Sequence, residues 1–235
     1  MSVDIVFLDA GETILHPHPS FTELFAQVCA AHGTLVQAGA VAEVQARLAP
    51  HLVDLAEETG VERGPTLSAD DSRTFWTYLY RRFLSELGID DPALPAELYT
   101  VFSTTSTYRL FDDVLPTLDR LAAAGYRIGL ISNFEGWLEK LLVELEVGHL
   151  FDVVVISGVE GVEKPDLGIY RLALERARAQ PGAAVHVGDS VTLDVEPAAA
   201  AGLHAILLDR WNRNAGRAGV TISSLEELPE VIPNL

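Results

Sequence analysis

The chain has 235 residues, of which 49% are hydrophobic, and its formal net charge is −18 at pH 7. This length suits one large domain or a core with a smaller insertion, and the composition is far from that of a disordered chain. Because a strongly negative surface repels polyanions, we expect neither nucleic acid nor a membrane as a partner.

Other features of the composition argue against secretion and membrane insertion. The sequence has no run of about 18 apolar residues, and the basic start of a signal peptide is missing. Cys29 is the one cysteine, which excludes disulfides within the chain and thiolate zinc sites. Its apolar setting is typical of a core residue on a helix. We therefore expect a cytoplasmic protein, and the sequence does not indicate its oligomeric state.

The first predicted element is a buried strand from Val3 to Leu8, which ends in the turn-like stretch Asp9-Ala10-Gly11-Glu12-Thr13. Residues 16–110 then show almost purely helical periodicity. Ser20 and Glu23 have the spacing of a capping box, and Pro50 is placed to bend or split a helix. The apolar stripes of the predicted helices are Phe21 to Cys29, Val41 to Leu48, Phe75 to Leu87, and Leu94 to Phe102.

From residue 113 onward, continuously apolar strands alternate with short helices. This pattern predicts a parallel sheet with both faces covered. The N-terminal strand has the same character and is expected to join that sheet, so the helical block is an insertion into an α/β core. The strands expected in this part of the chain are Ile128 to Ile131, Val153 to Ile156, Val185 to Val187, and Ala205 to Leu208.

Polar side chains follow the first four of these strands, at the edge where open parallel sheets bind ligands. Asp9 follows the first strand and Ser132-Asn133 the second; Lys164 lies in the loop after the third, and Asp189 and Asp194 follow the fourth. One aspartate after a strand is a helix cap or turn residue at least as often as a catalyst. Four such strand ends in one chain are hard to explain by packing alone.

These residue types suit phosphoryl transfer. A carboxylate can attack phosphorus and form an aspartyl phosphate, which divides one difficult displacement into two. Mg²⁺ prefers oxygen ligands and usually takes one or two carboxylates with substrate phosphate, a demand that Asp9, Asp189 and Asp194 can meet. Lys164 supplies local positive charge and Ser132 a hydroxyl donor for phosphoryl oxygens. Taken alone, Lys164 is equally well explained as a surface lysine before a proline turn.

Four segments, in order, resemble the motifs of the haloacid dehalogenase superfamily. The similarity spans residues 3 to 15 and about 113 to 208. It implies a Rossmann-like catalytic core formed by residues 1–15 and 111–235, with an all-α cap inserted at residues 16–110. The four segments are Asp9-Ala10-Gly11-Glu12-Thr13, Ile131-Ser132-Asn133, Lys164-Pro165-Asp166, and Gly188-Asp189-Ser190 with Asp194.

The resemblance also implies a role for each site residue. Asp9 corresponds to the nucleophile, and Ser132, Asn133 and Lys164 correspond to residues that bind the phosphoryl group. Asp189 and Asp194 correspond to ligands of Mg²⁺, together with Asp9 and the backbone carbonyl of Gly11. Thr13 resembles the threonine that braces the first motif. The expected substrate is a small phosphorylated metabolite, which the enzyme would hydrolyse.

One residue departs from the family pattern. Most phosphatases of this family have a second aspartate, the general acid and base, where this chain has Gly11. Glu12 is adjacent and is a candidate substitute, although neighbouring loop side chains usually point apart. His16 and His18 are further candidates, but more simply residues of a hinge beside prolines. His186, inside an apolar strand, is expected to be a core histidine with satisfied hydrogen bonds.

Three alternatives to an active phosphatase differ in the residues that they require. Phosphonate-cleaving relatives use a cap lysine, but Lys140 and Lys164 are the two lysines of the chain and both lie in the core. Carbon–halogen-cleaving relatives need no metal, whereas the acidic fourth motif is intact here. A slow or inactive member that binds a phosphorylated ligand or a protein partner remains an alternative because of Gly11.

Overall fold

The computed structural model describes residues 2–61, 64–214, 216 and 219–235. The chain divides into two compact units, Met1–Leu15 with Leu110–Leu235, and His16–Arg109. It passes from one unit to the other within two short strands, β2 (Leu15–Pro17) and β3 (Tyr108–Leu110), which pair with each other. In the described part of the chain, no helix is long and apolar enough to cross a membrane.

The first unit is built on a parallel six-stranded sheet. Its order is β5-β4-β1-β6-β7-β8, so the chain starts at the centre and extends to one side and then to the other. This is the doubly wound arrangement of Rossmann-like folds, and the predicted fold class is confirmed. The strands are β1 (Ile5–Leu8), β4 (Arg127–Ser132), β5 (Val153–Ile156), β6 (Ala184–Gly188), β7 (His204–Leu208) and β8 (Val220–Ile222).

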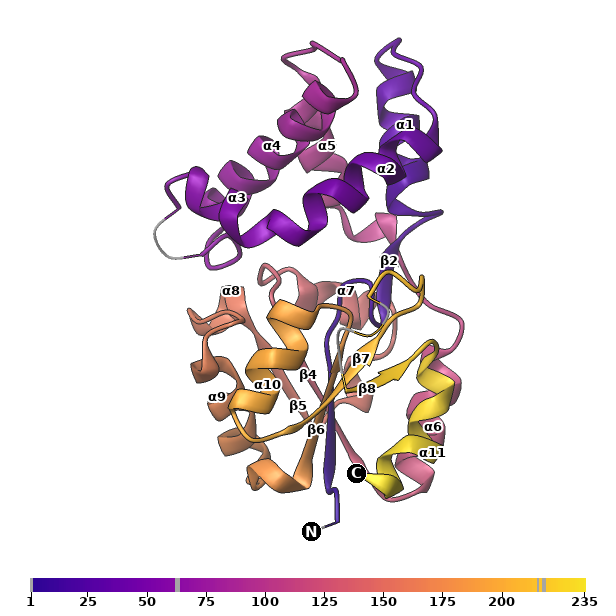
Figure 1. Ribbon diagram of the computed structural model, residues 1–235, viewed down its shortest axis with the longest axis vertical. Coiled ribbons are helices and arrows are strands. Elements are labelled where there is room, and N and C mark those ends of the chain that lie inside the picture. Colours follow the sequence, from indigo (N-terminus) through magenta and orange to yellow (C-terminus); the bar gives the residue numbers. More distant parts are fainter. Residues whose placement is uncertain (1, 62–63, 215, 217–218) are drawn as a thin grey trace. The chain divides into compact units, whose positions relative to one another are not determined.

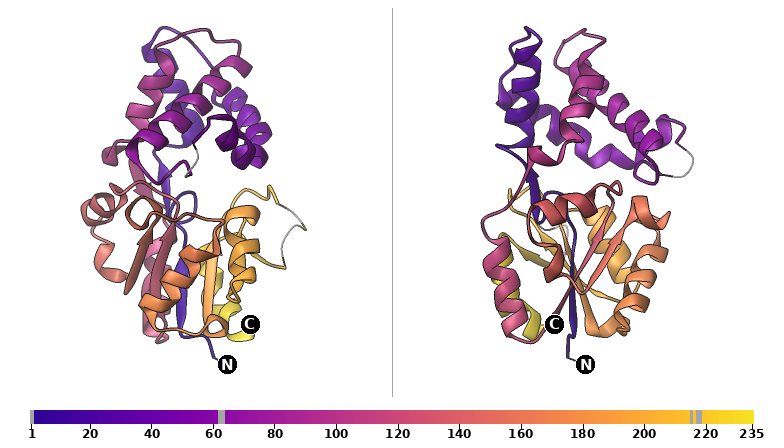
Figure 2. Two further views of the ribbon diagram at one scale, coloured as in Figure 1. Left: turned by 90° about the vertical axis from the view of Figure 1, so that its left-hand side faces the viewer. Right: turned by 180° about the vertical axis from the view of Figure 1, so that it is seen from behind.

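Helices cover both faces of this sheet, which explains why the central strands are buried along almost their whole length. The pair α9 and α10 lies on one face, and the pair α6 and α11 lies on the other (Figures 1 and 2). The helices of this unit are α6 (Val114–Ala123), α7 (Leu138–Glu144), α8 (Ser157–Glu160), α9 (Leu167–Ala177), α10 (Glu196–Ala200) and α11 (Leu228–Val231).

The second unit has a helical core of its own. Ser20 caps α1, since its Oγ accepts a hydrogen bond from Glu23 N. Pro50 splits the second predicted helix, as expected, because proline lacks the N–H that a helix interior requires. Phe25, Phe83 and Tyr80 contribute to the aromatic centre of the bundle. The helices are α1 (Phe21–Ala31), α2 (Ala38–Leu48), α3 (Leu52–Glu58), α4 (Ala69–Glu86) and α5 (Leu94–Phe102).

Candidate active site

The candidate site lies at the carboxyl ends of the three central strands, β4, β1 and β6. Strand β1 pairs with both neighbours, with Leu8 opposite Leu130 on one side and Val187 on the other. Asp9 therefore lies beyond the end of the central strand, between the ends of β4 and β6. The order of the sheet reverses at this point, and such switch points are where open α/β sheets bind ligands.

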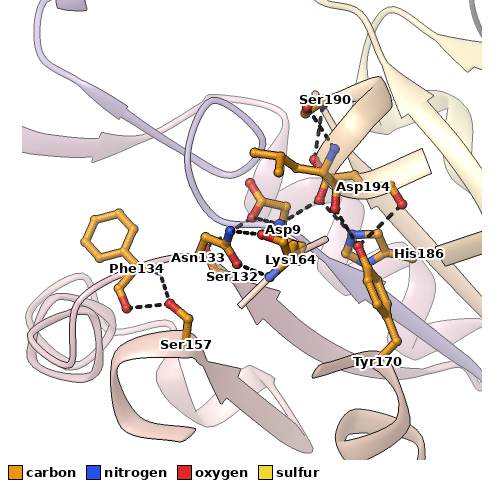
Figure 3. Close-up of polar contacts among 11 residues, drawn as sticks. Asp9, Ser132, Asn133, Phe134, Ser157, Lys164, Tyr170, His186, Ser190 and Asp194 are labelled. Carbon is orange, nitrogen blue, oxygen red and sulfur yellow. Dashed lines mark hydrogen bonds and ion pairs between the residues drawn. The ribbon is translucent and has the colours of Figure 1, made fainter. Parts of the chain in front are cut away.

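The Lys164 ammonium is the centre of the polar contacts (Figure 3). It is 3% exposed, and its Nζ donates to Asp9 Oδ1 and Asp194 Oδ1, at 2.6 Å each. Ser132 Oγ donates to the same Asp9 oxygen at 3.1 Å. Burial lowers the pKa of Lys164, but the charges of Asp194 and Asp9 outweigh it and raise this pKa above its usual value. Lys164 is thus a fixed positive charge against the Asp9 carboxylate.

The side chain of Asn133 holds the Lys164 segment by two hydrogen bonds to the backbone of Lys164. The Asn133 Nδ2 donates to Lys164 O, and its Oδ1 accepts from Lys164 N, both at 2.7 Å. Beside it, Ser157 Oγ accepts from Phe134 N at 2.9 Å and donates to Phe134 O at 3.1 Å. The amide that we expected to bind phosphate therefore fixes the backbone of the residue that carries the positive charge.

Asp194 reaches the site from a π-helical turn, Val191–Val195, that follows β6. Ser190 Oγ caps this turn by accepting from Leu193 N at 3.2 Å, and Ser190 N donates to Asp194 Oδ2 at 3.1 Å. Gly188 provides the space, since a Cβ at this position would lie 2.2 Å from Asp194 Cγ. Single π-helical turns are frequent at functional sites, and here the turn returns a carboxylate to the end of the strand.

Asp9, Asp189 and Asp194 form an acidic cluster, in which one carboxylate oxygen of each lies within 4.8 Å of the others. Burial, followed by the charges of Asp194 and Asp9, raises the pKa of Asp189 well above its usual value. Burial also raises the pKa of Asp9, against the opposing charge of Lys164. For Asp194, burial acts in the same direction, but Lys164 and His186 outweigh it and lower the pKa.

The donor set of this cluster fits a divalent cation. Three carboxylates against one ammonium leave two negative charges, in oxygen ligands of the kind that Mg²⁺ prefers. A bound cation would also oppose the burial and the repulsion between carboxylates that together raise the pKa values of Asp189 and Asp9. The cluster can therefore hold a metal, with Asp9 as a member that also carries a nucleophilic oxygen.

The segment after β7 holds the loop after β1. Glu12 has a φ of 55°, in the left-handed region that few residues other than glycine adopt. Burial raises the pKa of its carboxyl, and the charges of Arg213 and Arg210 oppose that rise. Arg210 donates to Thr13 O at 2.8 Å and forms a two-pronged ion pair with Asp113, at 2.7 and 2.9 Å. Arg210 thus ties the loop after β1 to the start of α6.

Two expectations for individual side chains need correction. The Thr13 hydroxyl is buried and has no hydrogen-bond partner among the described residues, so the brace is the Thr13 carbonyl that accepts from Arg210. His186 is fully buried as expected, but its Nε2 lies 2.9 Å from Asp194 Oδ1, and its Nδ1 has no partner in the described part of the chain. It is therefore a half-satisfied histidine at the site.

Of the other proton-transfer candidates, His16 and His18 belong to the helical unit, where their ring centroids are 6.1 Å apart. His16 Nδ1 lies 2.9 Å from Pro17 O.

Sequence reasoning missed Arg210, Ser157 and the role of His186. Arg210 follows β7, which is the fifth strand of the six-stranded sheet in chain order. The rule that ligands bind at the carboxyl ends of parallel strands therefore applies to Arg210 as well.

Comparison with known proteins shows the family of the chain. The family model of haloacid dehalogenase-like hydrolases matches residues 3–202. The chain is 29% identical over 204 residues to haloacid dehalogenase-like hydrolase domain-containing protein 3 of Mus musculus, covering 85% of this chain and 79% of that protein. It is 32% identical over 167 residues to the protein of the same name from Danio rerio, covering 68% and 69%.

More distant similarities extend the comparison. Over 121 residues the chain is 38% identical to a glyceraldehyde 3-phosphate phosphatase of Methanothermobacter thermautotrophicus, covering 50% of this chain and 53% of that one. The magnesium-bound structure of the putative HAD-hydrolase YfnB from Bacillus subtilis has the same fold, with a TM-score of 0.73, 18% identity and 99% of both chains covered. The chain belongs to the haloacid dehalogenase-like hydrolase family, and it is a hydrolase.

Proposed function

We propose that the protein is a Mg²⁺-dependent phosphohydrolase that acts on a small phosphorylated metabolite through an aspartyl-phosphate intermediate. The observation that carries this proposal is the buried Lys164 ammonium, 2.6 Å from both Asp9 Oδ1 and Asp194 Oδ1. With Mg²⁺ bound at the acidic cluster, this buried positive charge would give an anionic phosphoryl group a place to bind in a chain whose net charge is −18. The resemblance to a named phosphatase adds support.

Asp9 performs the covalent step. One of its carboxylate oxygens attacks phosphorus while the bond between phosphorus and the leaving oxygen breaks, and the leaving oxygen takes up a proton from water. Water then attacks the aspartyl phosphate, which releases inorganic phosphate and restores the carboxylate. Lys164 and Ser132, which contact Asp9 Oδ1, are placed to stabilise the charge on the phosphoryl oxygens in both steps.

Asp9, Asp189, Asp194 and the carbonyl of Gly11 would hold the metal. When bound, Mg²⁺ supplies Lewis-acid stabilisation of the charge on the phosphoryl group. Asp194 is the best prepared of the three carboxylates, because the charge of Lys164 and the hydrogen bond with His186 outweigh the effect of burial on its pKa. Asp189, whose pKa is raised by burial and by its acidic neighbours, is the carboxyl that a cation would change most.

Gly11 sets the limit of this activity. Without a carboxyl at this position, the protein lacks the acid that most relatives use to protonate the leaving group. Substrates whose leaving groups need little protonation, such as aryl and acyl phosphates, should therefore react best. We propose that the unit His16–Arg109 is the cap that selects among substrates.

The test is to measure release of phosphate from p-nitrophenyl phosphate and from a panel of phosphorylated metabolites, with Mg²⁺ and with a chelator. Release of halide from 2-haloacids is measured in parallel. Asp9→Asn should abolish phosphate release, while Asp166→Asn, in which asparagine can still cap α9, should not. Halide release that persists in chelator, without phosphate release, would falsify the phosphatase and favour carbon–halogen cleavage. If neither phosphate nor halide is released, the result would favour the non-catalytic alternative.

A further inference from the structure

His186 is a buried polar group that the proposed reaction does not use directly. It lies on β6 with 0% exposure, and its Nε2 is 2.9 Å from Asp194 Oδ1. The Tyr170 ring packs edge-to-face on the imidazole, with centroids 5.2 Å apart. Tyr170 Oη in turn donates to Leu193 O at 2.7 Å, within the turn that carries Asp194 (Figure 3).

The hydrogen bonds of the imidazole identify its tautomer. Among the described residues, Nδ1 has no hydrogen-bond partner. A proton on Nδ1 would be a buried N–H without an acceptor, whereas a bare Nδ1 leaves only a lone pair unsatisfied, which is the smaller cost. Nε2 therefore carries the proton, and His186 donates to Asp194 Oδ1.

With this hydrogen bond from His186, the two oxygens of Asp194 have different roles. Oδ1 accepts from Lys164 Nζ and from His186 Nε2, so both of its in-plane lone pairs are occupied. Oδ2 accepts from Ser190 N alone among the contacts described, and it retains a lone pair for a further partner. Gly188 packs directly against the carboxylate, and a Cβ at this position would displace it.

We infer that His186 is a positioning residue for the metal site: by occupying Asp194 Oδ1 it fixes the carboxylate plane so that Oδ2 faces the cation. The inference rests on the proposed function, because it assumes that the acidic cluster binds Mg²⁺. Carboxylate ligands are commonly oriented by such outer hydrogen bonds, whose loss typically costs about 10–100-fold in metal affinity. Nothing in this role requires His186 to touch the substrate.

The test is direct Mg²⁺ titration of the full chain by calorimetry, in the absence of substrate. His186→Phe keeps a buried ring against Tyr170 but has no donor, and we expect its Kd for Mg²⁺ to rise about 10–100-fold. His186→Gln retains a donor at a similar reach and should stay near the wild-type Kd. Tyr170→Phe is the matched control, because it removes a contact to the same turn without touching the Asp194 carboxylate.

Each outcome decides the matter. Unchanged Mg²⁺ affinity in folded His186→Phe overturns the inference while leaving the phosphatase proposal intact. Equal weakening in Tyr170→Phe also overturns it, because the effect would then come from packing of the turn. Wild-type protein that hydrolyses phosphate esters but binds no Mg²⁺ removes both the metal and this role. If His186→Phe does not fold, as judged by circular dichroism, His186→Leu is used for the same comparison.

Discussion

Replacing Gly11 by aspartate should restore the proton donor that the loop after β1 lacks. The backbone permits this change, because a Cβ at Gly11 meets no heavy atom within 4 Å and its φ lies outside the left-handed region. A Cβ that causes no strain also reduces the freedom of the unfolded chain, which for Gly→Ala contributes about 0.4–1 kcal/mol of stability. The variant should therefore fold, and its kinetics should report on chemistry rather than on damage.

The expected kinetic effect depends on the leaving group. General acid catalysis contributes about 10²–10⁴-fold, and it is needed most when the leaving oxygen is strongly basic. Gly11→Asp should thus raise kcat/KM for alkyl phosphates by up to about 10²–10⁴-fold and change aryl phosphates little. In the wild type, hydrolysis of the aspartyl phosphate also lacks its base, so a burst of the first product is expected.

The assay is a series of aryl and alkyl phosphates, with kcat/KM plotted against the pKa of the leaving alcohol. Wild type should give a steep negative slope, and Gly11→Asp a much flatter one. Gly11→Asn is the matched control, because it adds the same Cβ and nearly the same volume without an acid. A flat wild-type plot would refute the reasoning and turn attention to Glu12, with Glu12→Gln as the next variant. An equal gain in Gly11→Asn would refute it as well.

Three further variants test the site and its support. Gly188→Ala forces Asp194 aside, so the Mg²⁺ concentration for half-maximal activity should rise. The variant should also lose about 1–3 kcal/mol of stability in urea unfolding. An unchanged Mg²⁺ requirement would contradict the close packing of Gly188 against the Asp194 carboxylate. Lys164→Met should lower kcat about 10²–10³-fold at saturating Mg²⁺, as for loss of one transition-state donor, and near-normal turnover would exclude its role. Asp113→Asn should destabilise by about 1–3 kcal/mol at pH 7 because the half-buried Arg210 loses the charged partner of its ion pair. Although burial raises the pKa of Asp113, Arg210 and Ser224 lower it below its usual value, so its contribution is present above the usual aspartate pKa of about 4 and is lost as pH falls below it. The difference between Asp113→Asn and wild type should therefore shrink from pH 5 to pH 3, and a constant difference would contradict this assignment.

The sheet was predictable because its strands contain continuous runs of apolar residues. Val153 to Ile156 was predicted with the bounds that the structure has. The three-residue strands β2, β3 and β8 were not predicted, since such short segments show no periodicity above that of a loop. The π-helical turn at Val191–Val195 was not predicted, because a π-helical turn and an α-helix have similar sequence patterns.

The candidate site shows the same division between local and long-range information. The polar residues that follow the predicted strands can be read directly from the sequence, so the site residues around Asp9 could be predicted. The contact of His186 with Asp194 depends on the turn that inserts a residue after β6, which the sequence does not reveal. The contacts of Arg210 with Asp113 and Thr13 join residues 97 and 197 positions apart, and they depend on the order of strands in the sheet.

The most direct test of the central claim is to look for a phosphoryl group on Asp9. Wild-type protein is mixed with Mg²⁺ and an aryl phosphate, quenched in acid during the burst, and digested for mass spectrometry. The account predicts a phosphoryl adduct on the peptide that contains Asp9, at Asp9 itself, and its absence in Asp9→Asn. Phosphate release by wild type with no adduct, together with undiminished release by Asp9→Asn, would contradict the covalent mechanism.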